Sequence, residues 1–298
     1  MYWPTESQPV PLTELGWVNS LYLGNANSRT DPTIIWGTTI DAEPLESLIS
    51  ALSRRGGPII SQAHLLIRAV AQALIRHPLL NSRVIGRSVH RYRGVSIVMP
   101  MLQTRSGEVD TIFLQNAESL SVTDIACRLW EEARERALQA AAAKRLRTRE
   151  STPALRLAAA ARWARVHWVR SMSWLAFGVT NRLRFPTLFQ FDREYNGTNA
   201  FVNYLGFPGA PPMISYKPSC LSTNSFSVSV TMGPAEACAV AVNGSVAIRR
   251  QAPLFVRVDH RMVNGYQTGQ FVSTLRSFLM NPDSLMPTAL QPAEAIAS

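Results

Sequence analysis

"VRVDHRMVNGYQTGQF", residues 256–271, joins a β-strand pattern to a helix pattern through one histidine and an Asn-Gly pair. The apolar residues of 256–259 alternate as in a strand, and a helix is predicted to begin at Gly265. His260 would then lie at a strand-to-helix turn, where a sheet presents side chains outward. Histidine is the side chain best suited to proton transfer near neutral pH, so His260 is a candidate general base. An ordinary polar turn with Asn264-Gly265 explains the same pattern.

The residues upstream of this stretch predict short strands joined by tight turns. "AFVNYLG" (200–206), "SFSVSVTMG" (225–233), "ACAVAVNGSVAIRR" (237–250) and "PLFVRVDH" (253–260) are rich in β-branched or alternating residues. Asn243-Gly244, between two alternating runs, is a strong hairpin signal. The last helix is predicted over 264–282.

The N-terminal half alternates strands and helices. We predict a strand over 33–41, a helix over 42–55 stopped by Gly56-Gly57-Pro58, and a buried helix over 61–78 with Ser61 as its N-cap. Strands and turns follow up to residue 118, and a long helix over 121–147 has Ser121 or Thr123 as its cap. Together these elements predict one α/β domain with a mixed β-sheet flanked by helices.

Composition indicates a globular chain with one strongly basic segment. Of 298 residues, 46% are hydrophobic and 17% charged, and no apolar run reaches the roughly 18 residues that span a bilayer. Residues 133–184 hold 12 Lys/Arg and 2 Asp/Glu, which accounts for the whole net charge of +10. Three widely spaced cysteines and no signal-peptide pattern predict a cytoplasmic protein without a disulfide framework.

Within this basic region, residues 151–184 predict an amphipathic helix. Three functions fit it: binding a membrane surface, an acidic carrier protein or nucleic acid. A helix packed on its own domain with its arginines in solvent and a docking role are favoured equally over membrane binding, because the apolar stripe is largely alanine and a membrane-seeking helix usually has larger apolar residues. We therefore expect neither integral membrane association nor nucleic-acid binding.

No motif for nucleophilic catalysis, phosphate or dinucleotide binding, or metal binding is found in the sequence. The sequence has no GxSxG, phosphate loop, GxGxxG or Cys/His metal spacing. His64 and His77 lie thirteen positions apart on the predicted buried helix and are better explained as core or helix-end residues than as ligands. His90 lies among arginines on a predicted strand, and His167 belongs to the basic segment. No metal is expected.

"VRVDHRMVNG" resembles the HxxxDG motif of the superfamily that contains chloramphenicol acetyltransferase and the catalytic domain of 2-oxoacid dehydrogenase (dihydrolipoyl) acyltransferases. The similarity continues through the last helix, and "TIIWGTTIDAEPLESL", "ISQAHLLIRAVAQALIRHPLLNSRV" and "SVTDIACRLWEEARERA" resemble further blocks of the family in the same order. The resemblance covers roughly 33–147 and 197–283. It implies a chloramphenicol acetyltransferase-like two-layer sandwich and a homotrimer whose active sites lie between subunits.

The resemblance also implies site residues. His260 would be the general base, and Asn203 matches the position of the Ser or Thr that stabilises the oxyanion in the family. Ser215, Ser219 and Ser222 are alternatives for that role. Asn264 stands where aspartate is commonest in the family. In the acetyltransferase branch this aspartate is a structural partner of an N-terminal arginine, and some lipoyl-enzyme relatives carry asparagine instead. We see no Arg-rich helix before the first strand here, so we expect Asn264 to order the loop through neutral hydrogen bonds.

These features predict an N-terminal arm (1–32), one catalytic domain (33–283) with a basic helical insertion at about 148–196, and a C-terminal tail (284–298). No lipoyl domain, peripheral-subunit-binding domain or Ala/Pro-rich linker is visible, so we expect a stand-alone acyltransferase. The preferred activity is O-acetyl transfer from acetyl-CoA, as co-substrate, to a hydroxyl of a small biosynthetic intermediate, as in tetronate-type natural-product pathways. The basic segment would attract anionic coenzyme A, an acidic acyl carrier protein or an anionic acceptor. Acyl transfer from or to a carrier-protein thioester, and a non-catalytic scaffold with the same fold, are the alternatives.

Overall fold

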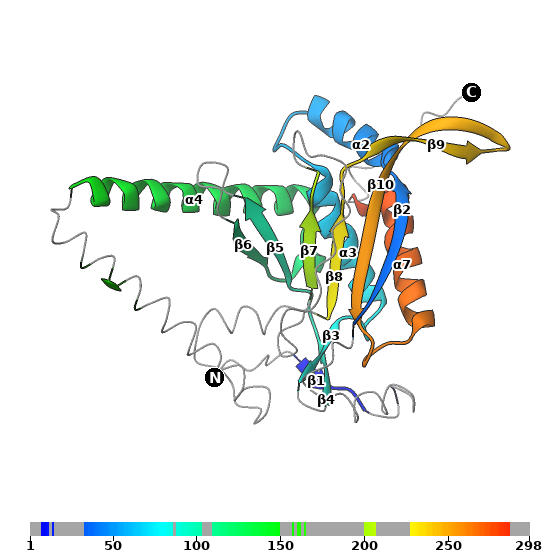
Figure 1. Cartoon of the computed structure of the whole chain (residues 1–298), viewed down its shortest axis with the longest axis horizontal. Helices are drawn as coiled ribbons and strands as arrows, with labels where there is room; N and C mark the ends of the chain where they lie inside the picture. Colours follow the sequence, from blue (N-terminus) through cyan, green and yellow to red (C-terminus); the bar gives the residue numbers. More distant parts are fainter. Residues whose placement is uncertain are drawn as a thin grey trace.

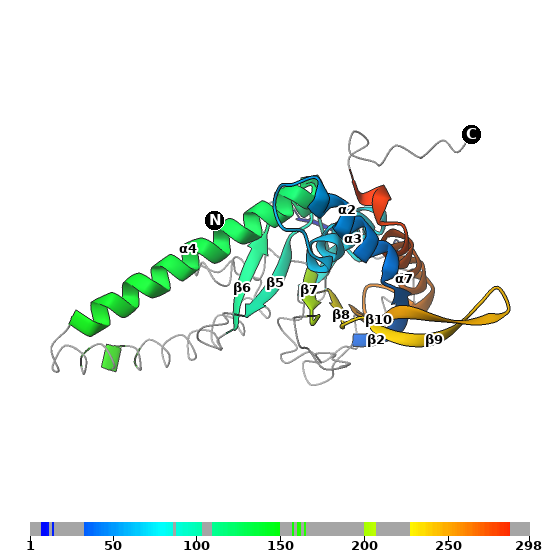
Figure 2. The same cartoon turned by 90° about the horizontal axis from the view of Figure 1, so that it is seen from above.

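The computed structural model places the helices on one face of a mixed sheet (Figures 1 and 2). It describes residues 7–11, 14, 33–85, 88–102, 109–149, 157, 160, 161, 164, 200–206 and 227–286. The predicted arm, the basic segment 151–184 and the serines at 215, 219 and 222 lie largely or wholly outside these residues. The two-layer α/β architecture predicted from the sequence is confirmed for the described part.

The main sheet has seven strands in the order β2-β10-β8-β7-β5-β6, with β9 also paired to β10. β7 runs parallel to both β5 and β8, and the other neighbours are antiparallel, so the sheet is mixed as predicted. The strands are β2 (Thr33–Asp41), β5 (Ile97–Leu102), β6 (Val109–Leu114), β7 (Ala200–Tyr204), β8 (Val228–Met232), β9 (Glu236–Val242) and β10 (Ser245–Asp259).

β10 is longer than the sequence suggested. The two runs on either side of 251–252 form one strand of 15 residues that continues through Pro253. Proline has no N–H to donate, but the carbonyl of Pro253 accepts a hydrogen bond from the N–H of Gly233 at 2.9 Å. One strand therefore carries the chain from the hairpin turn to His260.

Three helices, α2 (Glu43–Arg54), α3 (Gln62–Arg76) and α7 (Gly265–Met280), cover the sheet, and α3 is the most deeply buried of them. Its N-terminus is closed by a capping box in which the backbone N–H of Ser61 donates to Nδ1 of His64 at 3.0 Å. A smaller sheet of β1 (Ser7–Pro9), β4 (Ser88–Tyr92) and β3 (Ser82–Ile85) lies below the main one in Figure 1.

The two faces of the main sheet differ in polarity. On β8, Val228, Val230 and Met232 alternate with the polar residues Ser229 and Thr231, and all five are buried. In register with the apolar set lie Val202 of β7 and Val256 and Leu254 of β10, which form the core beneath the helices. The alternate positions place polar side chains on the opposite face, and Asn203, paired with Thr231, shares that face.

Two elements extend beyond this body in opposite directions (Figures 1 and 2). Helix α4 (Val122–Arg149) begins where Ser121 and Asp124 cap one another, so Ser121 rather than Thr123 is the cap. The β9–β10 hairpin turns at Asn243 (φ 50°) and Gly244 (φ 81°), the two positive φ angles that an Asn-Gly turn supplies. Among the described helices, none is both long and apolar enough to cross a membrane.

Candidate active site

His260 follows the last residue of β10 and is held in a short, well-anchored turn. The strand remains paired up to this point, because the N–H of Asp259 donates to the carbonyl of Ser227 at 3.1 Å. The turn then buries Met262 and Val263 completely. His260 itself is half-buried, so its ring is fixed at one end while the site stays accessible.

The His260 ring has a defined orientation. Its Nδ1 lies 2.7 Å from the carbonyl oxygen of Val263, three residues later in the same turn. A carbonyl only accepts, so this bond requires the proton on Nδ1. In the neutral ring Nε2 then carries the lone pair, which is the tautomer that a general base needs.

An ion pair flanks the histidine on both sides. The Nε of Arg261 donates to Oδ1 of Asp259 at 2.9 Å, and the backbone N–H of Arg261 donates to the same oxygen at 3.0 Å. Asp259 is 3% exposed, so its carboxylate depends on these donors for compensation. The pair fixes the backbone on either side of His260. Its signal in the sequence is the Asp-His-Arg triplet, residues 259–261.

Asn264 is the N-cap of α7. Its side-chain oxygen accepts from the N–H of Gln267 at 3.0 Å, and the Gln267 side chain accepts from the N–H of Asn264 at 3.0 Å. Both bonds are neutral, which agrees with the expected ordering of the loop, and Gly265 begins the helix as predicted. A direct part in the chemistry stays a prediction for Asn264.

Asn203 lies on β7 in register with Thr231 of β8, which pairs with Phe255 of β10. This places it on the polar face of the sheet, two strands from β10 and five residues short of His260. At the usual strand dimensions, Asn203 and His260 of one chain are separated by about 16 Å along the strands and about 10 Å across them. One copy of the chain therefore does not bring the predicted base and the predicted oxyanion donor together.

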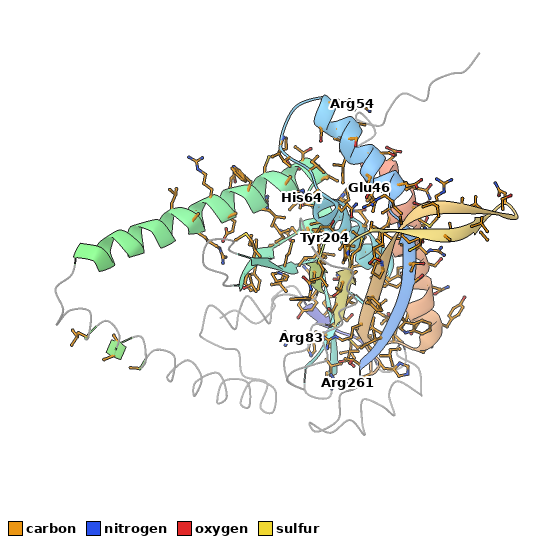
Figure 3. All side chains as sticks on the ribbon, turned by 45° about the horizontal axis from the view of Figure 1, so that its top comes forward. Glu46, Arg54, His64, Arg83, Tyr204 and Arg261 are labelled. Atoms are coloured by element: carbon orange, nitrogen blue, oxygen red, sulfur yellow. The ribbon has the colours of Figure 1, made fainter. Side chains whose placement is uncertain are left out.

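A polar network surrounds the end of β7 next to Asn203 (Figure 3). The Tyr204 hydroxyl donates to Oε1 of Gln62 at 3.0 Å, and Nε2 of Gln62 donates to Glu46 at 3.4 Å. Glu46 is held by Nε of Arg250 at 2.9 and 3.0 Å. Burial, and then the charge of Glu46, raise the pKa of Tyr204. Sequence reasoning missed this network because Tyr204 and Gln62 are 142 positions apart.

His64 and His77 have structural roles at the two ends of α3. Burial lowers the pKa of His64 to about 4, which keeps its Nδ1 a hydrogen-bond acceptor in the capping box. His77 ends α3 and lies 2.9 Å from the hydroxyl of Thr274 through Nε2. The helix-end interpretation is therefore confirmed for both. Within the described residues, no group of three or more His, Cys, Asp or Glu side chains could hold a metal ion.

Comparison with known proteins gives a family match in two blocks. The model of the 2-oxoacid dehydrogenases acyltransferase (catalytic domain) matches residues 11–151 and 223–287. These blocks include the His260 turn and leave out 152–222, where Asn203 lies. The equivalence proposed for Asn203 therefore rests on the sequence resemblance alone.

Individual relatives are distant. The chain is 23% identical over 255 residues to the chloroplastic dihydrolipoyllysine-residue acetyltransferase component 5 of the pyruvate dehydrogenase complex from Arabidopsis thaliana, covering 85% of this chain and 42% of that protein. It thus spans less than half the length of this relative.

Solved structures support the fold. The dihydrolipoamide acetyltransferase of Azotobacter vinelandii superposes with a TM-score of 0.58 at 17% identity, covering 93% of each chain. A chloramphenicol acetyltransferase superposes with a TM-score of 0.50 at 11% identity, covering 92% of this chain and 99% of the other. With the family model matching well over half of its residues, this chain belongs to the 2-oxoacid dehydrogenase acyltransferase (catalytic domain) family.

Proposed function

We propose that this protein transfers an acetyl group from acetyl-CoA to a hydroxyl of a small molecule, with His260 as the general base. The observation that carries the proposal is the 2.7 Å contact between Nδ1 of His260 and the carbonyl of Val263. It holds the imidazole in the tautomer that accepts a proton at Nε2. The contact therefore supports a role for His260 as a proton acceptor in a half-exposed turn.

In the proposed reaction, Nε2 of His260 takes the proton of the acceptor hydroxyl as its oxygen attacks the thioester carbonyl. The carbonyl π electrons move to oxygen and form a tetrahedral oxyanion. When this intermediate collapses, the C–S bond breaks, and the departing thiolate takes the proton back from the imidazolium. The products are the acetyl ester, free coenzyme A and a neutral His260.

The oxyanion needs a donor placed in advance, which is worth about 3–4 kcal/mol in studied cases. We assign this role to the side-chain amide of Asn203. In the Azotobacter vinelandii enzyme, a serine, a histidine and an asparagine were investigated for their role in the catalytic mechanism. The asparagine lies four positions after the histidine. His260 and Asn264 have the same spacing, and Asn203 would take the place of the serine.

Because Asn203 and His260 of one chain are far apart, we infer that the site forms between copies, and we expect a homotrimer. Mixing inactive His260→Ala and Asn203→Ala chains tests this inference. When the two chains exchange at random, each site takes His260 from one copy and Asn203 from the next. About one quarter of the sites then have both residues intact. Recovery of about a quarter of parent activity supports shared sites, and no recovery after verified chain exchange contradicts them.

A second acceptor class follows from the family. The name of the Arabidopsis thaliana relative specifies a dihydrolipoyllysine residue, so its substrate is a thiol rather than a hydroxyl. The same base would deprotonate either group. The acceptor panel should therefore contain dihydrolipoamide and free lipoyl domain beside hydroxyl-bearing small molecules and an acyl carrier protein.

The decisive experiment measures coenzyme A release from acetyl-CoA with a thiol reagent for hydroxyl acceptors, with the acetylated product identified by mass spectrometry. Thiol acceptors react with the reagent themselves, so for them the reaction is measured only by the mass of the acetylated product. We expect His260→Ala to lower the rate by on the order of 10²–10⁴-fold. His90→Ala is the matched control, since His90 lies on β4 of the small sheet, and it should keep the parent rate. A His260→Ala protein that transfers acetyl as fast as the parent excludes the general-base role.

A further inference from the structure

A small cavity lies between the C-terminal end of α3 and the small sheet. Its volume is about 260 Å³, a little below the roughly 300–1,000 Å³ of pockets that hold drug-sized ligands. Its residues are different from those of the His260 turn. Leu74, Ile75 and Pro78 form an apolar wall, and Gln8, Arg91 and Arg93 contribute polar side chains.

The lining combines positive charge with apolar surface. Arg91 and Arg93 contribute two guanidinium groups, and no Asp or Glu is among the described residues that line the cavity. Ile75, at the apolar wall, is 45% exposed, so a ligand could cover it. Arginine presents N–H groups that match the two oxygens of a carboxylate, and its flat face also packs on aromatic rings. The cavity therefore fits a small carboxylate with an apolar or aromatic body.

Arg91 has a donor that no described residue uses. Its Nε–H is buried and has no hydrogen-bond partner, whereas its Nη2 donates to the carboxylate of Glu14. A buried donor without an acceptor costs free energy, and most such groups in proteins are bonded. A single carboxylate placed side-on to the guanidinium would accept from Nε and Nη2 together.

The ion pair between Arg91 and Glu14 can be exchanged at little cost. The side chains are 31% and 43% exposed, and ion pairs this exposed contribute little to stability. Glu14 belongs to the predicted N-terminal arm, and β1 of the same arm is held separately by its pairing with β4. A ligand carboxylate could therefore replace Glu14 while β1 stays paired.

The segment that carries both arginines is held in place by Asn81. This residue is 3% exposed, and its Nδ2 donates to the carbonyls of Tyr92 at 3.1 Å and Gly94 at 3.2 Å. The N–H of Tyr92 donates in return to the carbonyl of Asn81 at 2.9 Å. These bonds fix the backbone on both sides of Arg93, so less freedom is lost when a ligand binds.

We propose that this cavity binds a small carboxylate with a short apolar or aromatic body, whose carboxylate bonds Arg91 and Arg93 in place of Glu14. The body of the ligand packs against Ile75 and Pro78. This binding involves no covalent step and does not rest on the proposed acetyl transfer.

The test measures the dissociation constant of benzoate by NMR titration of the full chain. Benzamide has nearly the same shape without the charge, and inorganic phosphate has the charge without the apolar body. We expect benzoate to bind at least about tenfold more tightly than benzamide, because only the carboxylate forms charge-assisted bonds. It should also bind more tightly than phosphate, which cannot cover the apolar wall. Either control ligand binding as tightly as benzoate, or no saturable binding of benzoate, would overturn the proposal.

Variants of the chain then locate the bound probe. Arg91→Leu should weaken benzoate binding by at least about tenfold, because it removes both donors to the carboxylate. Glu14→Gln should tighten it by about two- to fivefold, because the competing carboxylate is lost. Arg54→Leu is the matched control and should keep the parent constant, since Arg54 is exposed on α2, far from the small sheet (Figure 3).

Thermal unfolding without the probe checks that each variant is folded. If Arg91→Leu does not fold, Arg93→Leu replaces it and should weaken benzoate binding by about threefold or more, because Arg93 is exposed and keeps only part of the charge effect. Parent affinity in the arginine variant would overturn the proposal. Unchanged or weaker binding by Glu14→Gln would overturn the exchange with Glu14.

Discussion

Asn264→Ala tests whether the residue after the His260 turn acts through the helix that it caps. The substitution removes the acceptor for the N–H of Gln267 and leaves the reciprocal bond, from the N–H of Asn264 to the Gln267 side chain, in place. α7 itself should remain formed, because Phe271 and Leu275 anchor it in the core.

The expected loss follows from one missing cap bond at an exposed position. Replacing an Asn cap by Ala costs about 1 kcal/mol in the free energy of unfolding. The free energy of unfolding falls by about 3 kcal/mol per molar urea for a chain of this size. The urea concentration at the unfolding midpoint should therefore fall by about 0.3 M. Val263, whose carbonyl holds His260, directly precedes the cap, so kcat should fall while KM changes little.

Asn264→Asp is the matched control. A carboxylate accepts the same N–H, and its charge is favourable at a helix N-terminus by about 0.3–1 kcal/mol. We therefore expect parent stability or slightly more, and a kcat close to that of the parent. If Asn264→Ala unfolds at the parent urea concentration, the capping role is wrong. If Asn264→Asp keeps its stability but loses kcat, Asn264 acts on the reacting groups directly rather than through the turn.

Two further variants test groups beside the site. His64→Gln keeps an acceptor for the N–H of Ser61 but cannot titrate. Because burial lowers the pKa of His64 to about 4, the unfolded parent binds more protons between pH 6.5 and 4, and its free energy of unfolding should fall by up to about 3 kcal/mol across that window. Urea unfolding at several pH values should show a shallower fall for the variant, and equal curves would contradict the assignment. Tyr204→Phe removes the bond to Gln62 and should cost about 1 kcal/mol in unfolding free energy, measured by urea titration at pH 7, where no change would show that the bond contributes nothing.

Local pattern was sufficient to predict most of the secondary structure. The strand over 33–41 matches β2 residue for residue, and α3 begins after Ser61 as its cap predicted. These elements have strong periodicity and end at Gly, Pro or capping residues, which act over a few positions. Pairing order was not predictable in this way, because the neighbours of β7 are β5 and β8, and the bonds that select them join residues far apart in the chain.

The site was predictable only where its parts are close in sequence. His260, Asn264 and Gly265 occupy one turn, so a single stretch indicated the histidine, the cap and the start of the helix together. The network of Tyr204 and Gln62 gave no such signal, since its members are on different elements and each is an ordinary surface-type residue by itself.

The position of Asn203 on β7 relates the proposed transfer reaction to the association of copies of the chain. If Asn203 and His260 had been adjacent on one chain, a monomer would suffice for the proposed reaction. Their register instead puts them at different levels of the sheet, with Asn203 five residues short of His260. The proposed reaction therefore needs a second copy of the chain to supply the oxyanion donor. Weakening the association between copies should therefore lower transfer activity in proportion to the loss of assembled protein, even where the weakening change touches no reacting atom.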